Sequence, residues 1–301
     1  MDGVINVLKP PGMTSNDVVV YLRRLLKEKV GHTGTLDPGA AGVLPVCVGK
    51  ATRLADFIVE EDKAYRCEMV LGVETDTLDS YGRIVSTSNQ YPSFEDINRV
   101  FEEFQGRIRQ VPPMHSAIKY RGKKLYEYVR QGQHLDISGL EREVIIYRSA
   151  ILNYSPPNRV LFEVECSKGT YIRSLCRDIG RRLGCGAYVS FLLRCRTGRY
   201  TLSDSYTLHE IEDCFSKGEL HELVIPMDKA IDRLERFDVP AVYYKRLING
   251  NPVKLGIVNL KLKRWDCQNP MRIYCKGEFI GVGTAKLEEG YIHIKMDKVL
   301  V

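Results

Sequence analysis

One carboxylate in this sequence stands where another molecule could reach it. Asp37 lies in residues 31–42, a stretch with four glycines and one proline. Glycine has no side chain to block an approach, so an atom of another molecule could come close to the Asp37 carboxylate. An aspartate in such a place can act as a nucleophile or a base, or it can brace the loop as an Asx-turn residue. The residues alone give these two interpretations equal weight.

Other chemistries fit the same region less well. A phosphate-binding P-loop is excluded, because Gly49-Lys50 is followed by Ala51 and Leu44 stands where the motif requires glycine. His32 has no second histidine at metal-ligand spacing, so a structural or solvent-facing histidine is the simpler interpretation and no metal site is predicted.

Three further polar residues could serve either the structure or a functional site. Tyr65 occupies a strand pattern, where a tyrosine usually packs half-buried. Tyr171 and Arg173 stand near the start of a predicted helix, and an arginine there is either an exposed charge or the partner of a buried carboxylate. Periodicity does not decide between these alternatives.

The elements on either side of the glycine-rich stretch must position Asp37. Residues 4–8 are apolar and β-branched and end at Lys9-Pro10-Pro11-Gly12, which predicts a strand followed by a turn. A helix capped by Thr14 or Ser15 should follow, because apolar residues recur after it at helical spacing. The run 43–48 predicts a buried strand, so the glycine-rich stretch is a loop held between regular elements.

The remaining pattern predicts an α/β domain and a smaller β-rich one. We expect strands at residues 65–71, 144–154 and 160–166, helices at 93–104 and 170–183, and short strands at 271–275, 279–285 and 291–299. The change to short predicted strands towards the C-terminus predicts a domain boundary near residue 236, which gives domains 1–236 and 237–301.

Residues 105–134 form a basic aromatic segment, which we call the basic arm. Glu127 is its only acidic residue, whereas arginines, lysines and tyrosines are interleaved along it. Such a mixture is typical of a surface that binds RNA. Its basic and aromatic members include Arg107, Arg109, His115, Lys119, Tyr120, Arg121, Lys123, Lys124, Tyr126, Tyr128 and Arg130.

Composition sets outer limits. The chain has 301 residues and a net charge of +6, which permits an acidic partner without requiring one. Nine cysteines without a CxxC motif argue against a disulfide framework or a zinc ribbon and favour a reducing compartment. With neither a secretory leader nor about 18 consecutive apolar residues, we expect a cytoplasmic protein with no membrane span.

Taken in order, the motifs resemble those of the TruB family of tRNA pseudouridine synthases over essentially the whole chain. They are Asn6-Val7-Leu8-Lys9-Pro10-Pro11-Gly12-Met13-Thr14-Ser15, Gly31-His32-Thr33-Gly34-Thr35-Leu36-Asp37-Pro38 with Gly42-Val43-Leu44, Lys63-Ala64-Tyr65, and Lys168-Gly169-Thr170-Tyr171-Ile172-Arg173. The resemblance implies an α/β catalytic domain on a curved mixed sheet and a C-terminal PUA domain that binds RNA. It also implies modification of uridine-55 in the T loop of tRNA, with no cofactor.

The resemblance also implies roles for individual residues. Asp37 matches the essential catalytic aspartate, Arg173 the arginine that pairs with it, and Tyr65 the tyrosine that stacks on the target base. His32 matches a histidine that helps displace the flipped nucleotide. Tyr171 and Leu192 match pocket-lining positions. The basic arm is too variable for such a transfer, and Lys123 and Lys124 are expected to bind RNA phosphates because of their charge.

Two other functions compete with this one. A non-catalytic protein that binds or folds tRNA would explain the basic arm but not the loop, tyrosine and arginine motifs occurring together. A guide-RNA-dependent pseudouridine synthase is the second, but the chain has no long lysine-rich tail, which favours a stand-alone bacterial type. We therefore expect a monomer that binds the T arm of tRNA without an obligatory protein partner; a glycoside hydrolase is a distant third.

Overall fold

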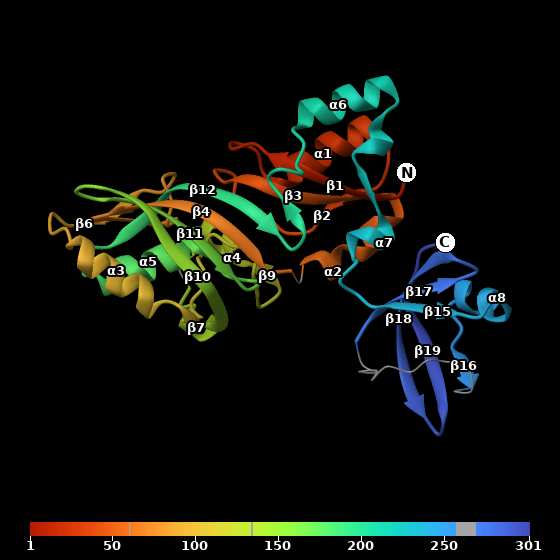
Figure 1. Cartoon of the computed structure of the whole chain (residues 1–301). Helices are drawn as coiled ribbons and strands as arrows, with labels where there is room; N and C mark the ends of the chain where they lie inside the picture. Colours follow the sequence, from red (N-terminus) through yellow and green to blue (C-terminus); the bar gives the residue numbers. More distant parts are fainter. Residues whose placement is uncertain (60, 134, 257–268) are drawn as a thin grey trace.

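A computed structural model describes residues 1–59, 61–133, 135–256 and 269–301 (Figure 1). Its main feature is a curved, ten-stranded mixed sheet. In the described residues its strands pair antiparallel apart from β3 and β12, which run parallel. In spatial order the strands are β14 (Val224–Pro226), β1 (Gly3–Lys9), β3 (Ala41–Val48), β12 (Ala187–Thr197), β4 (Lys63–Leu71), β11 (Arg159–Cys166), β10 (Arg142–Ser155) and β7 (Gly106–Gln110), while β2 (Val30–His32) pairs with β3 and β13 (Tyr200–Thr201) with β12.

Helices cover this sheet and fill its main core. The helices that contribute apolar side chains are α1 (Ser15–Leu26), α3 (Phe94–Glu103), α5 (Ile172–Arg182) and α6 (Leu208–Lys217). Thr14 caps α1 as predicted, because its Oγ1 accepts from Asp17 N at 3.0 Å while Asp17 Oδ2 accepts from Thr14 N at 2.8 Å. Val18 and Leu22 then point inward. The shorter helices are α2 (Ala55–Val59), α4 (Leu125–Arg130), α7 (Met227–Ala230) and α8 (Tyr244–Ile248).

Strands β1 and β3 are buried on both faces. Ile5 and Val7 enter the main core, while Val4 on the opposite face enters a second apolar cluster with Val43 of β3. Successive residues of a strand point to opposite faces, so a strand covered on both sides becomes an almost continuous apolar run. This explains why residues 43–48 are apolar throughout and residues 4–8 are apolar apart from Asn6, and both predicted strands are confirmed.

The C-terminal part of the chain forms a separate five-stranded sheet. Its strands, in spatial order, are β15 (Arg236–Val239), β17 (Met271–Cys275), β18 (Glu278–Glu288), β19 (Tyr291–Val299) and β16 (Val253–Gly256). Ile273, Ile280 and Ile294 are fully buried in a core of its own, which confirms the predicted β-rich character. Phe279 and Val282 also belong to the second cluster with Val4, so the two sheets share apolar contacts. Residues 257–268 lie outside the described residues; they belong to the segment 249–270, which is too variable for family roles to be transferred to single residues.

Two small hairpins extend from the large sheet. One consists of β5 (Val73–Thr75) and β6 (Ile84–Thr87), and the other of β8 (Lys119–Tyr120) and β9 (Lys123–Lys124). The second hairpin and α4 belong to the basic arm, whose first residues form β7 of the large sheet.

The predicted helix 170–183 begins later than expected. Thr170 Oγ1 donates to Ser167 O at 2.9 Å and closes a turn, so α5 starts at Ile172. None of the helices in the described part of the chain has both the length and the apolar character that a membrane span needs. The eight cysteines described are free thiols.

Candidate active site

The loop between β2 and β3 carries Asp37, and its backbone is fixed despite its glycines. Ser15, at the start of α1, makes two hydrogen bonds to Leu36, the residue before Asp37. Leu36 N donates to Ser15 Oγ at 2.8 Å, and Ser15 Oγ donates to Leu36 O at 3.2 Å. Thr33 Oγ1 donates to Pro45 O at 3.1 Å at the other side of the loop. These bonds fix the direction in which the Asp37 side chain leaves the backbone.

A buried lysine supports the same loop. Lys9, at the end of β1, is fully buried, and its Nζ donates to the carbonyl oxygens of Pro10 at 2.8 Å, Met13 at 2.6 Å and Pro38 at 3.3 Å. The lysine thus ties the turn after β1 to the residue that follows Asp37. Burial lowers the pKa of Lys9 to about 8, although the nearby Asp37 charge opposes that effect.

A buried arginine holds the other side of the loop. Arg194 of β12 is 1% exposed, and its Nε donates to Val43 O at 2.7 Å while its Nη2 donates to Gly34 O at 3.1 Å. Gly42 passes directly over the Arg194 backbone with φ +118°, and a Cβ there would lie 2.2 Å from Arg194 O. Glycine is therefore required at Gly42, both for its backbone angle and for this close approach.

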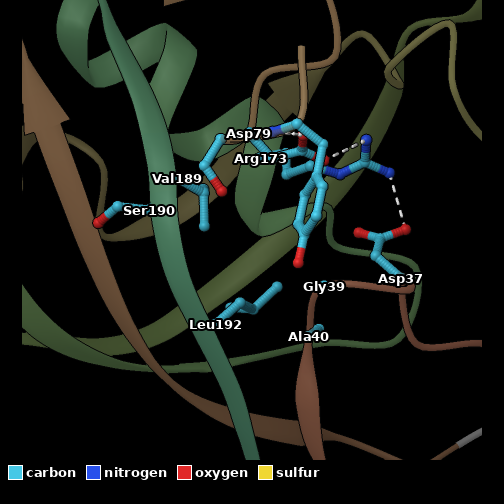
Figure 2. Close-up of a pocket in the computed structure, with 10 residues that line it drawn as sticks. Asp37, Gly39, Ala40, Asp79, Arg173, Val189, Ser190 and Leu192 are labelled. Atoms are coloured by element: carbon cyan, nitrogen blue, oxygen red, sulfur yellow. Dashed lines mark hydrogen bonds and ion pairs between the residues drawn. The ribbon is translucent and has the colours of Figure 1, made fainter. Parts of the chain in front are cut away.

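Arg173 brings four separate segments of the chain to one point. It projects from the first turn of α5, is 4% exposed, and its Nη2 lies 2.8 Å from Asp37 Oδ1 (Figure 2). The same Nη2 donates to His115 O at 2.9 Å at the base of the basic arm. Its Nη1 donates to Thr77 O at 2.9 Å and reaches Asp79 Oδ2 at 3.5 Å, both in the loop between β5 and β6.

The electrostatics of Asp37 are a balance of opposing effects. Burial raises the pKa of the Asp37 carboxyl above its ordinary value, and the negative charge of Asp79 acts in the same direction. The Arg173 guanidinium and, more weakly, Lys9 act against this rise because each positive charge favours the carboxylate. Arg173 is thus the main group that favours the ionised form of Asp37.

A pocket opens beside this ion pair. It encloses about 300 Å³ of empty space open to solvent. Figure 2 shows Asp37 and Arg173 on one side of it, with Leu192 and Val189 of β12 facing them. The full lining is Asp37, Gly39, Ala40, Asp79, Ser80, Tyr81, Arg173, Val189, Ser190 and Leu192. In the described part of the chain, no group of three or more His, Cys, Asp or Glu side chains could hold a metal ion.

Three of the expected residues, Asp37, Arg173 and Leu192, therefore meet at one pocket, whereas Tyr65 and His32 lie outside its lining. Tyr65 of β4 is 8% exposed beside Arg194, and burial raises its pKa to about 12. His32 is half-buried in β2, where its Nδ1 accepts from Gly34 N at 3.3 Å. Burial, and then the Arg194 charge, lower the pKa of His32, so its neutral form is favoured.

Tyr171 stands immediately before α5 and is also outside the pocket lining. Its backbone is clamped by the side chain of Gln110, which accepts from Tyr171 N at 3.1 Å and donates to Tyr171 O at 3.3 Å. The Arg142 guanidinium lies 4.8 Å from the centre of its ring. Such a cation–π contact fixes the ring orientation next to the start of the helix that carries Arg173.

The two lysines that are expected to bind RNA phosphates lie on the hairpin of the basic arm. Lys123 is exposed and sits 5.9 Å from the ring centre of Tyr128, and Lys124 is half-buried at 5.5 Å from that of Tyr126. The base of the basic arm is joined to α5, since Val111 O accepts from Ser174 Oγ at 2.9 Å. The basic hairpin is thereby connected to the helix that carries Arg173.

Sequence reasoning missed Lys9, Asp79 and Tyr81. Lys9 could have been found because it follows Ile5 and Val7 at every second position of the same strand, and such residues point to the same face of a sheet. Asp79 and Tyr81 lie among turn-forming residues without periodicity, and the Asp79–Arg173 contact spans 94 residues. No local sequence pattern predicts that contact.

The site therefore combines a curved mixed sheet with a pocket at which the buried Arg173 is paired with the Asp37 carboxylate. The fold resembles the protein in the solved structure "Crystal Structure of a Cbf5-Nop10-Gar1 Complex", with a TM-score of 0.75 and 30% identity over 99% of this chain and 85% of that one. Residues 23–172 match the model described as TruB family pseudouridylate synthase (N terminal domain), and residues 173–232 match the tRNA pseudouridylate synthase B C-terminal domain. The chain belongs to the TruB family of pseudouridylate synthases.

Curated relatives agree over nearly the full length. A protein from Pelotomaculum thermopropionicum named tRNA pseudouridine synthase B is 49% identical over 297 residues, which cover 96% of this chain and 92% of the relative. One from Clostridioides difficile with the same name is 40% identical and is covered completely, as is this chain. The family resemblance drawn from the motifs is therefore confirmed.

Proposed function

We propose that this protein converts uridine-55 in the T loop of tRNA to pseudouridine, acting alone. Membership of the TruB family and the names of the curated relatives support a tRNA substrate. The observation that carries the proposal is the Asp37 carboxylate, held 2.8 Å from a buried arginine at an open pocket. Position 55 and the T loop are what the motif resemblance implies.

The reaction is an isomerisation, and its atoms balance within the substrate. The bond between N1 of uracil and C1′ of ribose breaks, the base turns, and a bond forms between C5 and C1′. C5 then loses its proton and N1 gains one, so that the product has the same composition as the substrate. A uridine in a stacked loop must first leave the stack before a protein group can reach that bond. Asp37 then acts on the ribose, either as a nucleophile at C1′ or as a base on a sugar proton.

The neighbours of Asp37 suit these needs. Arg173 aims the carboxylate and favours its charged form, because it donates to Asp37 while being fixed itself by two backbone carbonyls. Leu192 and Val189 give the pocket an apolar side, which helps to keep water away from the detached uracil. His32 and Tyr65 are proposed to displace the nucleotide and to stack on the base. Because Tyr65 is only 8% exposed, the base reaches its ring only after groups at the pocket move.

Binding is proposed to be spread over the molecule. Lys123 and Lys124 of the basic arm would contact phosphates. Tyr171 would contact the substrate near the pocket. Residues 237–301 would form a PUA domain that binds RNA, separated from the catalytic domain 1–236. The protein is also proposed to act as a monomer in the cytoplasm, where tRNA is modified.

The alternatives have less support. One solved structure of similar fold is of a Cbf5-Nop10-Gar1 complex, but the matching protein is 30% identical to this chain, against 49% for a relative named tRNA pseudouridine synthase B. A purely RNA-binding function leaves the aimed carboxylate at the pocket without a purpose.

The test is to incubate the purified protein alone with a tRNA transcript and map pseudouridine along it. We expect product at position 55 and none in a transcript that carries cytidine there. Product that forms only after a guide RNA or a second protein is added would contradict the stand-alone proposal. Product at another position would contradict the choice of uridine-55.

A further inference from the structure

Tyr81 lies at the mouth of the pocket and has no part in the chemistry described above. It sits in the loop between β5 and β6, and 72% of it is exposed. The residue lines the same pocket as Asp37 and Leu192. Single exposed apolar side chains are common on protein surfaces, so exposure alone says little. The position of Tyr81 beside the reacting carboxylate sets it apart.

The backbone that carries Tyr81 is fixed. Tyr81 N donates to Asp79 Oδ1 at 3.0 Å, and Thr77 Oγ1 donates to the same oxygen at 2.6 Å. Thr75 Oγ1 donates to Asp79 O at 2.7 Å on the other side of the turn. Since the second oxygen of Asp79 contacts Arg173 at 3.5 Å, the position of Tyr81 is coupled to the arginine that aims the catalytic carboxylate.

The ring of Tyr81 rests on Gly39, two residues from Asp37. A Cβ added at Gly39 would lie 2.2 Å from Cε2 of Tyr81, so glycine alone leaves room for the ring in this place. The ring is therefore supported from the side of the catalytic loop while most of its surface faces solvent. An aromatic ring with a fixed backbone and an exposed surface is suited to receive a flat partner.

We propose that Tyr81 stacks on a nucleobase of the RNA, namely a base that flanks the target uridine. This inference rests on the proposed function. Removing one nucleotide from a stacked loop leaves its neighbours without a stacking partner, and an aromatic side chain at the pocket mouth replaces that partner. Tyr81 is thus a positioning residue, which holds the RNA while the uridine occupies the pocket beside Asp37.

The first test compares three substitutions. Tyr81→Phe keeps the ring, Tyr81→Leu keeps an apolar side chain without a ring, and Tyr81→Ala removes both. With a T-arm stem-loop as substrate, we expect the Leu and Ala variants to raise KM by roughly 5- to 150-fold, as the loss of one stacked base does, and to change kcat less. Tyr81→Phe should stay within about twofold of the wild type, because stacking needs the ring alone. Tyr91→Ala is the matched control, since Tyr91 is also exposed but does not line the pocket.

The second test identifies the base. Stem-loops with an abasic site at each position next to the target are bound to wild type and to Tyr81→Ala in a double-mutant cycle. At the stacked position, Tyr81→Ala should add no further loss of affinity once the base is gone. The inference would be overturned if the losses of binding free energy from Tyr81→Ala and from the abasic site were fully additive at every flanking position. It would also be overturned if Tyr81→Leu had the same KM as Tyr81→Phe, or if Tyr81→Ala left KM unchanged or lowered it. If the wild type binds the stem-loop yet forms no pseudouridine, the proposed function fails, while the binding cycle still decides the role of Tyr81.

Discussion

Replacing Arg173 by alanine should destabilise the fold and raise the pKa of Asp37 further. The arginine side chain is 5% exposed and serves two carboxylates and two backbone carbonyls. Removing one partner of a buried ion pair costs about 3–5 kcal/mol. Because 33% of the Asp37 side chain is exposed and water can reach it, we expect a loss near 3 kcal/mol, which lowers Tm by about 6–12 °C in a domain of this size.

The loss should depend on pH with a definite sign. Arg173 favours the carboxylate, so without it Asp37 takes up a proton at higher pH. The penalty of Arg173→Ala is then largest at neutral pH and shrinks as pH falls and Asp37 is protonated in both proteins. For the same reason, the acidic limb of the kcat/KM profile should move to higher pH.

Chemical denaturation of wild type and variant at several pH values measures this penalty. The matched control is Arg182→Ala, from the same helix, since Arg182 also binds a carboxylate at 2.8 Å but its side chain is 59% exposed. That control should cost about 0–1 kcal/mol. If Arg173→Ala costs no more than Arg182→Ala, or if its penalty grows on acidification, the account of the buried pair is wrong.

Three further predictions concern the pocket and the basic arm. Lys123→Ala combined with Lys124→Ala should lower the salt slope of tRNA binding by roughly one to two while kcat at saturating tRNA is unchanged, and an unaltered slope would mean that this hairpin faces away from the RNA. Tyr65→Phe should keep tRNA affinity within a few-fold because the ring can still stack, but it should lose most turnover because the hydroxyl, which is hydrogen-bonded to Arg194, is gone. Full activity would show that the hydroxyl has no chemical role. Gly39→Ala should displace the Tyr81 ring and raise KM, whereas in the Tyr81→Ala background the same change should raise KM little further. An equal rise in KM in both backgrounds would show that the ring does not rest on Gly39.

Local patterns were enough to predict the elements around the loop that carries Asp37. The Thr14 cap and the helical spacing of Val18 and Leu22 place α1, and the apolar run places β3, because each depends on neighbours within a few residues. The motif resemblance supplied Asp37 and Arg173 as partners. Spacing alone left both open, since 136 residues separate them and only the packing of α5 on the sheet brings them together.

Other features depend on contacts that no local pattern encodes. Lys9 looks like part of a surface turn, yet three carbonyl oxygens make its burial possible. Tyr81 owes its place to hydrogen bonds of Asp79 and to the absence of a side chain at Gly39, which lies elsewhere in the sequence. Interactions of this kind become visible only once the segments are packed.

The central claim is that Asp37 carries out the chemistry, and Asp37→Asn tests it most directly. Asparagine keeps the size of the side chain and an oxygen that can accept from Arg173, but it removes the charge and the nucleophile. The assay is release of tritium from uracil C5 of a tRNA transcript, run beside filter binding on the same preparations, with the exposed Asp213→Asn as control. We predict no tritium release by Asp37→Asn and normal release by the control. The tRNA affinity of Asp37→Asn should stay within about tenfold of wild type, because the proposed RNA contacts are spread over the molecule. Turnover by Asp37→Asn at about a tenth of the wild-type rate or more would contradict the claim, because the loss of a required nucleophile or base costs far more than that.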